Sequence, residues 1–270
     1  MHENDAASKK AHAKINIGLN ILGKRADGYH EIETIFQEIS LHDELIFQHA
    51  EDIILESNDP GCPTDASNLV YRAALLLQKK SRPARGIRIQ IQKNIPMRSG
   101  LGGGSSDAAC TIKTLSERWQ IPLSREEEIK TSAEIGSDVP FFIIGGTALG
   151  KGRGEILEPV EIISDYWGVL VIPEIKIATA WAFSRLNFNL TKSLKKSNFS
   201  AFMQNSADYE SWRRVLNNNL EPVVCGTFPQ ISHWVDQLYK HGAFYAQMSG
   251  SGSAVFGLYE TKDLAGTPGY

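Results

Sequence analysis

The chain has 270 residues, of which 42% are hydrophobic, and a formal net charge of −3 at pH 7. That hydrophobic content is enough for one large core or two ordinary ones. The near-neutral balance gives no electrostatic reason to expect nucleic acid or an anionic membrane surface as a partner. No apolar run is long enough to span a bilayer.

The three cysteines, Cys62, Cys110 and Cys225, are far apart and form no Cys-x-x-Cys pair. Their odd number and spacing argue against a disulfide framework or a zinc knuckle. Residues 1–10 are polar and of mixed charge, unlike a signal peptide. We therefore expect a soluble, cytoplasmic protein.

The first structured stretch, residues 11–22, alternates apolar and polar side chains. This alternation predicts a strand with Lys14 and Asn16 on its polar face. Surface lysines and asparagines are usually only solvated, so the strand alone assigns them no role. A polar turn over 23–30 follows, and further strands are expected over 31–40, 44–49 and 53–57.

A helix is predicted from Ser67 or Asn68, as its cap, to about Lys80. Residues 86–93 then alternate isoleucine with polar side chains, which indicates a half-buried strand. Four glycines, two serines and an aspartate follow within 100–107, and a helical pattern continues over 105–119.

This order of strand, glycine-rich turn and helix is typical of a site for a polyanion, usually phosphate. Glycines let backbone N–H groups approach a ligand, and the first turn of the helix adds unpaired donors and the positive end of its dipole. The plainer alternative is a flexible loop that ends in an ordinary Ser/Asp helix cap.

Beyond this loop, Ser124 and Glu127 form a capping box at the start of a helix that ends near Ile135. Glycines between 145 and 154 mark turns of a hairpin, and the apolar residues 168–172 predict a strand. Helical segments are expected over 179–186, 198–204, 209–216 and 229–239. A second small-residue loop, 248–253, precedes a strand over 254–259. We place the domains at 1–158 and 159–270.

Several familiar sites are absent from the sequence. No Gly-x-x-x-x-Gly-Lys-Ser/Thr, His-Arg-Asp or His-Glu-x-x-His motif occurs, which excludes a P-loop, a protein kinase and a zincin. A dinucleotide fold would open on its glycine loop and continue to a ribose-binding acid, whereas here the loop lies a third of the way along the chain.

Phosphoryl transfer requires a cradle for the triphosphate, an aligned acceptor and compensation of charge. Asp138, which follows a helix, is a candidate base for an acceptor hydroxyl. Lys14 would lower the pKa of that hydroxyl or hold Asp138 ionised. A cap on the following segment explains Asp138 equally well, and the residues alone leave the two interpretations even.

Three separated motifs resemble those of the GHMP small-molecule kinases. They are Ala13-Lys14-Ile15-Asn16, the loop 96–109 and the glycine-rich stretch 248–253. The added stretches Arg25-Ala-Asp-Gly-Tyr-His30 and Gly136-Ser-Asp-Val-Pro140 are similar to the 4-diphosphocytidyl-2-C-methyl-D-erythritol kinases among them. The resemblance spans residues 11–258, and its tyrosine-histidine loop is the specific part.

The resemblance implies an α+β fold of two domains. The N-terminal domain would be like domain 2 of ribosomal protein S5, and the C-terminal domain would be ferredoxin-like. It implies ATP-dependent phosphorylation of the 2-hydroxyl of 4-diphosphocytidyl-2-C-methyl-D-erythritol, in the non-mevalonate route to isoprenoid precursors. ATP and Mg²⁺ are the expected cofactors, the partner is a small-molecule substrate, and the chain is expected to be a monomer or weak homodimer.

By position, the resemblance makes Asp138 the base and Lys14 its partner. The implied nucleotide contacts are Asn68, Lys93, Pro96, Met97, Arg98, Ser99, Gly100, Leu101, Gly102, Gly103, Gly104, Ser105, Ser106 and Asp107, with Ser106 also a magnesium ligand. The implied substrate contacts are Asn16, Tyr29, His30, Phe36, Thr179 and Phe183, with Tyr29 and Phe183 on either side of the cytosine ring. From their apolar surroundings alone, Phe36 and Phe183 would be core residues.

Three departures from the family pattern stand out. His12 occupies a position that is often proline, and Asp107 one where some relatives carry asparagine, which weakens its purine contact. The tail 261–270 is short, so the edge of the second domain is expected to be incomplete. Another GHMP kinase, of the mevalonate or sugar-alcohol type, and a non-catalytic S5-like nucleotide-binding module are the alternative functions.

Overall fold

The computed structural model describes residues 6–81, 83–162, 165–186 and 197–266. The chain divides into two compact units. The first unit comprises Met1–Lys14, Glu38–Met97 and Gly102–Gly146, and the second comprises Ile15–Gln37, Arg98–Leu101 and Thr147–Tyr270. Because neither unit is continuous in sequence, they do not test a single division at residue 158, which stays a prediction.

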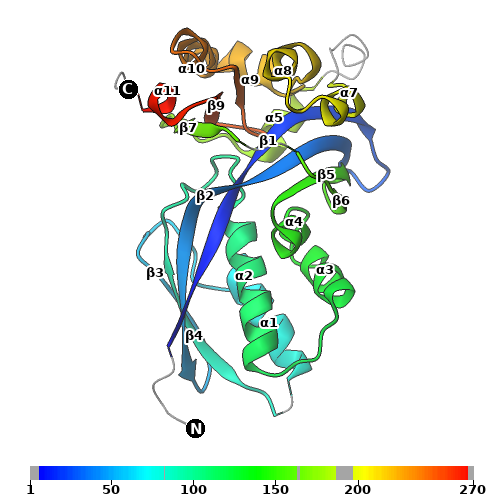
Figure 1. The fold of residues 1–270 in the computed structure, drawn as a ribbon. Helices are drawn as coiled ribbons and strands as arrows, with labels where there is room; N and C mark the ends of the chain where they lie inside the picture. The colour runs from blue at the N-terminus through cyan, green and yellow to red at the C-terminus, as the bar shows by residue number, and fades with distance from the viewer. Residues whose placement is uncertain (1–5, 82, 163–164, 187–196, 267–270) are drawn as a thin grey trace. The chain divides into compact units, whose positions relative to one another are not determined.

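The first unit is a sheet covered by helices. Strand β4 (Gly86–Gln92) pairs with the C-terminal half of β2 (His30–Ala50) in antiparallel register and with β3 (Ile53–Ser57) in parallel register. The isoleucines of β4 are buried and alternate with more exposed polar residues. Figure 1 shows α1 (Leu69–Lys80) and α2 (Gly103–Arg118) side by side against this sheet. Helices α3 (Arg125–Ala133) and α4 (Val139–Ile144) pack on α2.

In the second unit, the N-terminal half of β2 pairs with β5 (Thr147–Gly152). Strand β5 also pairs with β6 (Ile156–Pro159), and these two strands form a hairpin. It also contains an antiparallel sheet in the order β7-β9-β8, formed by Trp167–Val171, Val255–Tyr259 and Tyr245–Met248. Its helices are α5 (Thr179–Ser184), α7 (Phe199–Gln204), α8 (Tyr209–Val215), α9 (Glu221–Thr227), α10 (Pro229–Lys240) and α11 (Lys262–Ala265).

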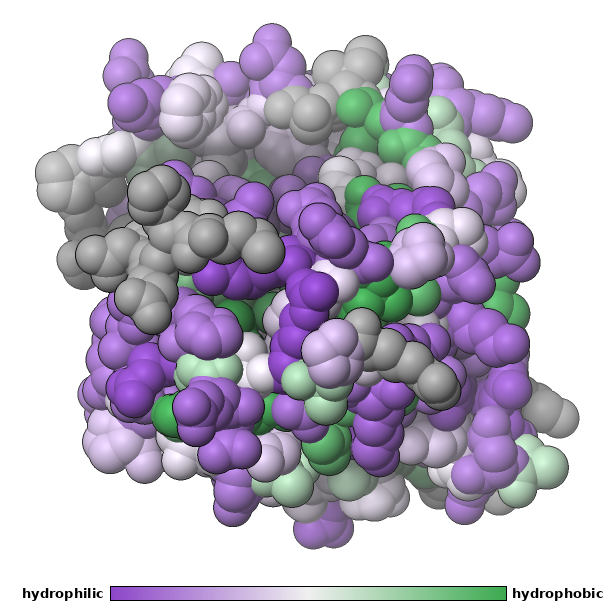
Figure 2. Space-filling view, turned by 90° about the horizontal axis from the view of Figure 1, so that it is seen from below, coloured by the Kyte–Doolittle hydropathy of each residue, from purple (hydrophilic) through white to green (hydrophobic). Residues whose placement is uncertain are grey.

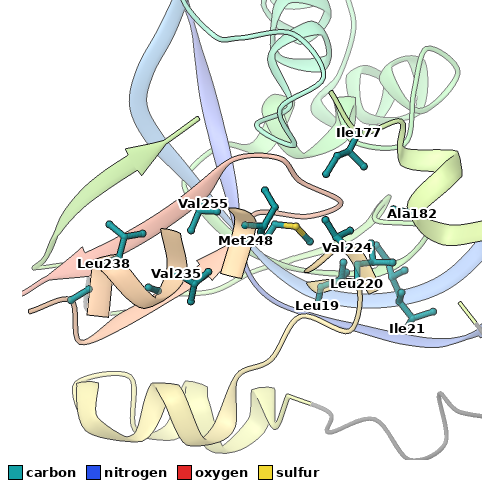
Figure 3. Close-up of a cluster of buried hydrophobic side chains, with 14 of the residues drawn as sticks. Leu19, Ile21, Ile177, Ala182, Leu220, Val224, Val235, Leu238, Met248 and Val255 are labelled. Atoms are coloured by element: carbon teal, nitrogen blue, oxygen red, sulfur yellow. The ribbon is translucent and has the colours of Figure 1, made fainter. Parts of the chain in front are cut away.

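A hydrophobic cluster holds the second unit together (Figure 3). Helix α10 contributes Leu238, the sheet contributes Met248 and Val255, and α9 contributes Val224. Strand β1 (Ala7–Lys24) adds Leu19 and Ile21 from its inward face. Burial of this apolar surface, at roughly 25 cal/mol per Å², is the main force that folds the unit.

Most predicted elements are present, with four differences. The stretches 31–40 and 44–49 form one continuous strand, β2, because its pairing passes from β5 to β4 without interrupting the backbone. Helix α2 begins at Gly103, two residues before the predicted start. Residues 141–144, for which no element was predicted, are helical and lie within α4. Strand β8 and helices α9 and α11 were not predicted.

Within the described residues, no helix is long and apolar enough to cross a membrane. In the space-filling view of Figure 2, hydrophilic residues cover most of the visible face and hydrophobic ones form small separate groups. The described part of this face therefore lacks the broad apolar surface that marks many stable protein–protein interfaces.

Candidate active site

Lys14 and Asp138 lie together in the first unit, although 124 positions separate them in the sequence. The Nζ atom of Lys14 is 4.0 Å from Oδ2 of Asp138. The lysine side chain is 5% exposed, whereas the aspartate side chain is 36% exposed. Burial lowers the pKa of Lys14, and the negative charge of Asp138 partly offsets this. The pair therefore combines a buried cation with a carboxylate that solvent and ligands can reach.

Asp138 occupies the N-cap position of α4, but its side chain makes no capping hydrogen bond. An aspartate used as a cap would accept a bond from a backbone N–H in the first turn. Pro140, in the first turn of α4, has no N–H to donate. The carboxylate is thus directed to something other than capping, which removes the main objection to a chemical role.

The start of α2 has the form expected of a phosphate site. Gly102, at the N-cap, has φ +74° and supplies no side-chain cap. A Cβ atom on Gly102 would lie 2.7 Å from the ring of Phe142 and 3.2 Å from Cγ of Lys14. Glycine is therefore required here both for the backbone turn and for close packing against the lysine stem. The first-turn N–H groups of this 16-residue helix have no capping side chain.

The middle of the glycine loop, residues 98–101, belongs to the second unit and packs on the loop 248–253. Ala254 donates its N–H to the carbonyl oxygen of Ser99 at 3.0 Å, and Ser249 donates its hydroxyl to the carbonyl of Gly100 at 3.2 Å. A Cβ atom on Gly100, where φ is +82°, would lie 2.4 Å from the carbonyl oxygen of Ser249. Two glycine-rich motifs, far apart in sequence, are thus one structure.

Lys93 and Asp107, both expected to contact the nucleotide, form a buried ion pair with Nζ–Oδ2 of 2.9 Å. Lys93 is also paired with Asp43, a residue that the sequence did not single out. Burial would lower the pKa of Lys93, but Asp107 and Asp43 raise it above its usual value. Burial raises the pKa of Asp107 to about 7, against the opposing charge of Lys93.

The remaining oxygen of Asp107, Oδ1, is buried and has no hydrogen-bond partner. Asn68, another expected nucleotide contact, caps α1 by accepting the N–H of Val70 at 2.8 Å, and its amide donates to the carbonyl of Pro63. The polar atoms of Asn68 therefore stabilise the local fold.

The structure supplies few ligands for a metal. Among the described residues, no group of three or more His, Cys, Asp or Glu side chains is placed to hold an ion. The hydroxyl of Ser106 donates to the carbonyl of His12 at 2.6 Å, and its lone pairs stay available to a cation. Mg²⁺ usually keeps several waters and takes phosphate oxygens with one or two protein ligands, a pattern that this donor set fits.

Aromatic side chains gather in the second unit around the tyrosine-histidine loop. The ring of His30 stacks on Phe183 with centroids 4.7 Å apart and an interplanar angle of 23°. Tyr29 is 52% exposed, and the guanidinium of Arg153 lies 4.8 Å above its ring. Burial lowers the pKa of His30, and the charge of Lys24 adds to this effect, which favours the neutral form of the ring.

The other expected substrate contacts differ in exposure. Asn16 is buried, and its amide donates to the hydroxyl of Thr34 at 3.1 Å. Thr179 is exposed at the start of α5, with its hydroxyl 3.0 Å from that of Ser251. Phe36 is 1% exposed and packs directly over Gly150, so the structure places it in the core.

Sequence reasoning missed the residues that hold the loop 248–253. The amide of Asn218 donates to the carbonyls of Met248 and Gly250 at 2.9 and 2.8 Å. Glu221, which is partly buried, accepts the N–H of Met248 at 2.7 Å, and desolvation raises its pKa to about 7. The run of three asparagines at 217–219, between apolar residues, was the available signal.

Two family models match the chain: the GHMP kinases N terminal domain over residues 68–146 and the GHMP kinases C terminal model over residues 192–267. The 4-diphosphocytidyl-2-C-methyl-D-erythritol kinase of Shouchella clausii is 40% identical over 94% of this chain and 86% of that protein. The enzyme of the same name from Enterococcus faecalis is 38% identical over 95% of this chain and 91% of its own.

A solved structure supports the same relationship. The crystal structure of 4-(cytidine 5'-diphospho)-2C-methyl-D-erythritol kinase superposes with a TM-score of 0.81 at 30% identity, covering 96% of this chain and 92% of that one. The expected α+β architecture of two GHMP kinase domains is therefore confirmed. The chain belongs to the 4-diphosphocytidyl-2-C-methyl-D-erythritol kinase family of the GHMP kinases.

Proposed function

We propose that this protein transfers the γ-phosphoryl group of ATP to the 2-hydroxyl of 4-diphosphocytidyl-2-C-methyl-D-erythritol, with Asp138 as the base and Lys14 as its partner. The family relationship makes it an ATP-dependent kinase that acts on a small molecule. The proposed acceptor is the substrate that appears in the names of its relatives. The assignment of roles rests on the contacts of the residues themselves.

The Lys14–Asp138 pair carries this proposal. The carboxylate of Asp138 makes no capping hydrogen bond and is 36% exposed, so it can accept the proton of an acceptor hydroxyl. The ammonium of Lys14, 4.0 Å away, pairs with this carboxylate and would hold it in place beside the acceptor. As the acceptor oxygen bonds to the γ-phosphorus, its proton passes to Asp138, the β,γ-bridging P–O bond breaks and ADP leaves.

The glycine loop and α2 are the proposed binding site for the triphosphate. The uncapped first turn of α2 offers N–H donors and a positive dipole end, which suit phosphate oxygens. Mg²⁺ would enter with the nucleotide, with the hydroxyl oxygen of Ser106 as its expected protein ligand. When bound, the ion neutralises part of the phosphate charge.

The aromatic residues of the second unit are the proposed site for the cytosine of the acceptor. A flat base gains affinity from stacking on side chains such as Tyr29 and Phe183. A neutral His30 ring can both donate and accept hydrogen bonds on a base edge. The ring of His30 lies against Phe183, so a base that stacks on this face of Phe183 requires the two rings to separate. The fully buried Phe36 would support the site from the core.

An ADP-release assay with a panel of acceptors tests the proposed reaction. Purified protein is offered ATP and Mg²⁺ with 4-diphosphocytidyl-2-C-methyl-D-erythritol, mevalonate, homoserine or galactose in turn. We expect turnover with the cytidyl acceptor alone, and the phosphorylated product identified by mass spectrometry. Turnover with mevalonate or a sugar but not with the cytidyl compound would contradict the proposed substrate. Nucleotide binding without turnover on any acceptor would support a non-catalytic module instead.

A further inference from the structure

Asp43 is a fully buried carboxylate in the interior of β2, and neither the motifs nor the proposed chemistry uses it. Its Oδ1 atom accepts the N–H groups of Asn94 and Ile95 at 2.6 and 2.8 Å. Its Oδ2 atom pairs with Nζ of Lys93. One side chain thus holds the three residues that lead from β4 into the glycine loop.

The same lysine connects Asp43 to the other end of the loop. Nζ of Lys93 also bonds Oδ2 of Asp107, at the start of the second turn of α2, at 2.9 Å. Gly103 packs closely on this lysine, because a Cβ atom there would lie 3.3 Å from Nζ. Asp43 therefore contacts both sides of the glycine loop. It bonds the backbone directly where the chain leaves β4, and it reaches α2 through Lys93, which bonds Asp107.

We propose that Asp43 is a positioning residue for ATP binding, which fixes the entry and exit of the glycine loop so that the N–H groups of α2 are preorganised for the triphosphate. This inference rests on the proposed function of that loop. A preorganised site binds more tightly because the ligand does not have to order it. Asp43 itself need not touch the nucleotide.

The chemistry of this cluster requires a carboxylate. Two carboxylates and one ammonium share a site where all three side chains are at most 5% exposed. In an Asp43→Asn variant the amide oxygen can still accept both backbone N–H groups, but its NH₂ group would face the Lys93 ammonium, donor against donor. D43N should therefore lose the contact of residue 43 with Lys93. It should keep the hydrogen bonds from the N–H groups of Asn94 and Ile95.

The test measures the binding of an ATP analogue that cannot be hydrolysed, by calorimetry, in the full chain. For D43N we expect the Kd of the analogue and the KM for ATP to rise about tenfold, the size expected for losing a charge-assisted hydrogen bond. The KM for the cytidyl acceptor should change less than about twofold, since no described contact of Asp43 reaches the residues assigned to it. This split between two KM values distinguishes positioning from a general loss of fold.

Glu128→Gln is the matched control. Glu128 is also a largely buried carboxylate of the first unit, paired with Arg125 at 3.3 Å, and it meets α2 at Ser116, far from the first turn. E128Q should leave the Kd of the analogue unchanged.

A double-mutant cycle covers the case in which D43N does not fold. Lys93→Met removes the ammonium, so residue 43 of D43N/K93M keeps its backbone bonds, and Asp107, left without Lys93, is expected to hold a proton. If Asp43 acts through Lys93, the double variant should bind the analogue about as weakly as K93M alone. Binding of wild-type strength by D43N or by D43N/K93M would overturn the inference. Failure of the wild-type chain to bind the analogue would contradict the proposed function instead.

Discussion

At the scale of single residues, the position of Asp138 decides how the first unit is interpreted. It stands where a helix cap would stand, yet its carboxylate makes no capping bond and lies 4.0 Å from Nζ of Lys14. The lysine is buried and the aspartate is partly open, so the pair has the asymmetry that a base and its electrostatic partner need.

Tyr29→Ala should weaken the binding of the cytidyl acceptor. Loss of one stacking partner for a base costs roughly 1–3 kcal/mol, so the KM for the acceptor should rise between about fivefold and a hundredfold with kcat little changed. Steady-state kinetics with the acceptor varied at saturating ATP measures this. Trp167→Ala, which removes another half-exposed aromatic of the second unit, should leave that KM unaltered. An unchanged KM for Y29A would remove Tyr29 from the substrate site.

Gly100→Ala should destabilise the protein. Alanine at φ +82° costs roughly 1–2 kcal/mol of backbone strain, and its Cβ would lie 2.4 Å from the carbonyl oxygen of Ser249. We expect a fall in Tm of several degrees by differential scanning fluorimetry. Gly104→Ala is the matched control, because a Cβ atom there meets nothing within 4 Å and its φ is not positive. Equal Tm values for the two variants would show that the loop adapts without strain.

At the scale of elements, the periodic segments were predictable and the long-range hydrogen bonds were not. Strands β1 and β4 and helices α1, α2 and α3 follow from alternation, helical spacing and the capping box at Ser124, which are local properties. Asp43 bonds a backbone group 52 residues away and Asn218 one 32 residues away. No local pattern encodes such pairs. The contact of the Asp138 side chain likewise depends on Lys14, which lies 124 positions earlier in β1.

Asn218→Ala should destabilise the loop 248–253 and the sheet behind it. The change leaves the carbonyls of Met248 and Gly250 without their donors in a buried setting, at a cost of roughly 2–4 kcal/mol. Urea unfolding followed by circular dichroism measures the loss. Asn217→Ala is the neighbouring control, because the amide nitrogen of Asn217 is buried without a partner, and it should cost less. The opposite order of the two variants would contradict the bracing role of Asn218.

At the scale of the whole molecule, the buried carboxylates predict how stability depends on pH. Burial raises the pKa of Glu221 and of Asp107 to about 7, above the values of 4.5 and 3.8 that these groups have in water. The folded chain therefore holds protons that the unfolded chain has lost between pH 5 and 7. The contribution of these two groups to the free energy of unfolding should be greatest below about pH 4 and should fall as pH rises through 7.

Glu221→Gln isolates this effect. Glutamine keeps an acceptor for the N–H of Met248 but cannot ionise, so the variant should gain on the wild type as pH rises from 5.5 to 8, by at most roughly 3 kcal/mol. Urea unfolding at both pH values gives the difference. Glu126→Gln, on the exposed face of α3, should follow the wild type at both. A constant offset between E221Q and wild type would show that Glu221 does not titrate in this range.

Asp138 is proposed to remove the proton of the acceptor while the glycine loop holds ATP, and an Asp138→Asn variant separates these two roles. Single-turnover phosphorylation of the cytidyl acceptor should slow by at least about a hundredfold, because the amide cannot take the proton. The Kd of a non-hydrolysable ATP analogue should stay within about twofold of the wild-type value, since chemistry and binding rest on different groups. Wild-type turnover by D138N, with nucleotide binding intact, would show that Asp138 is not the base.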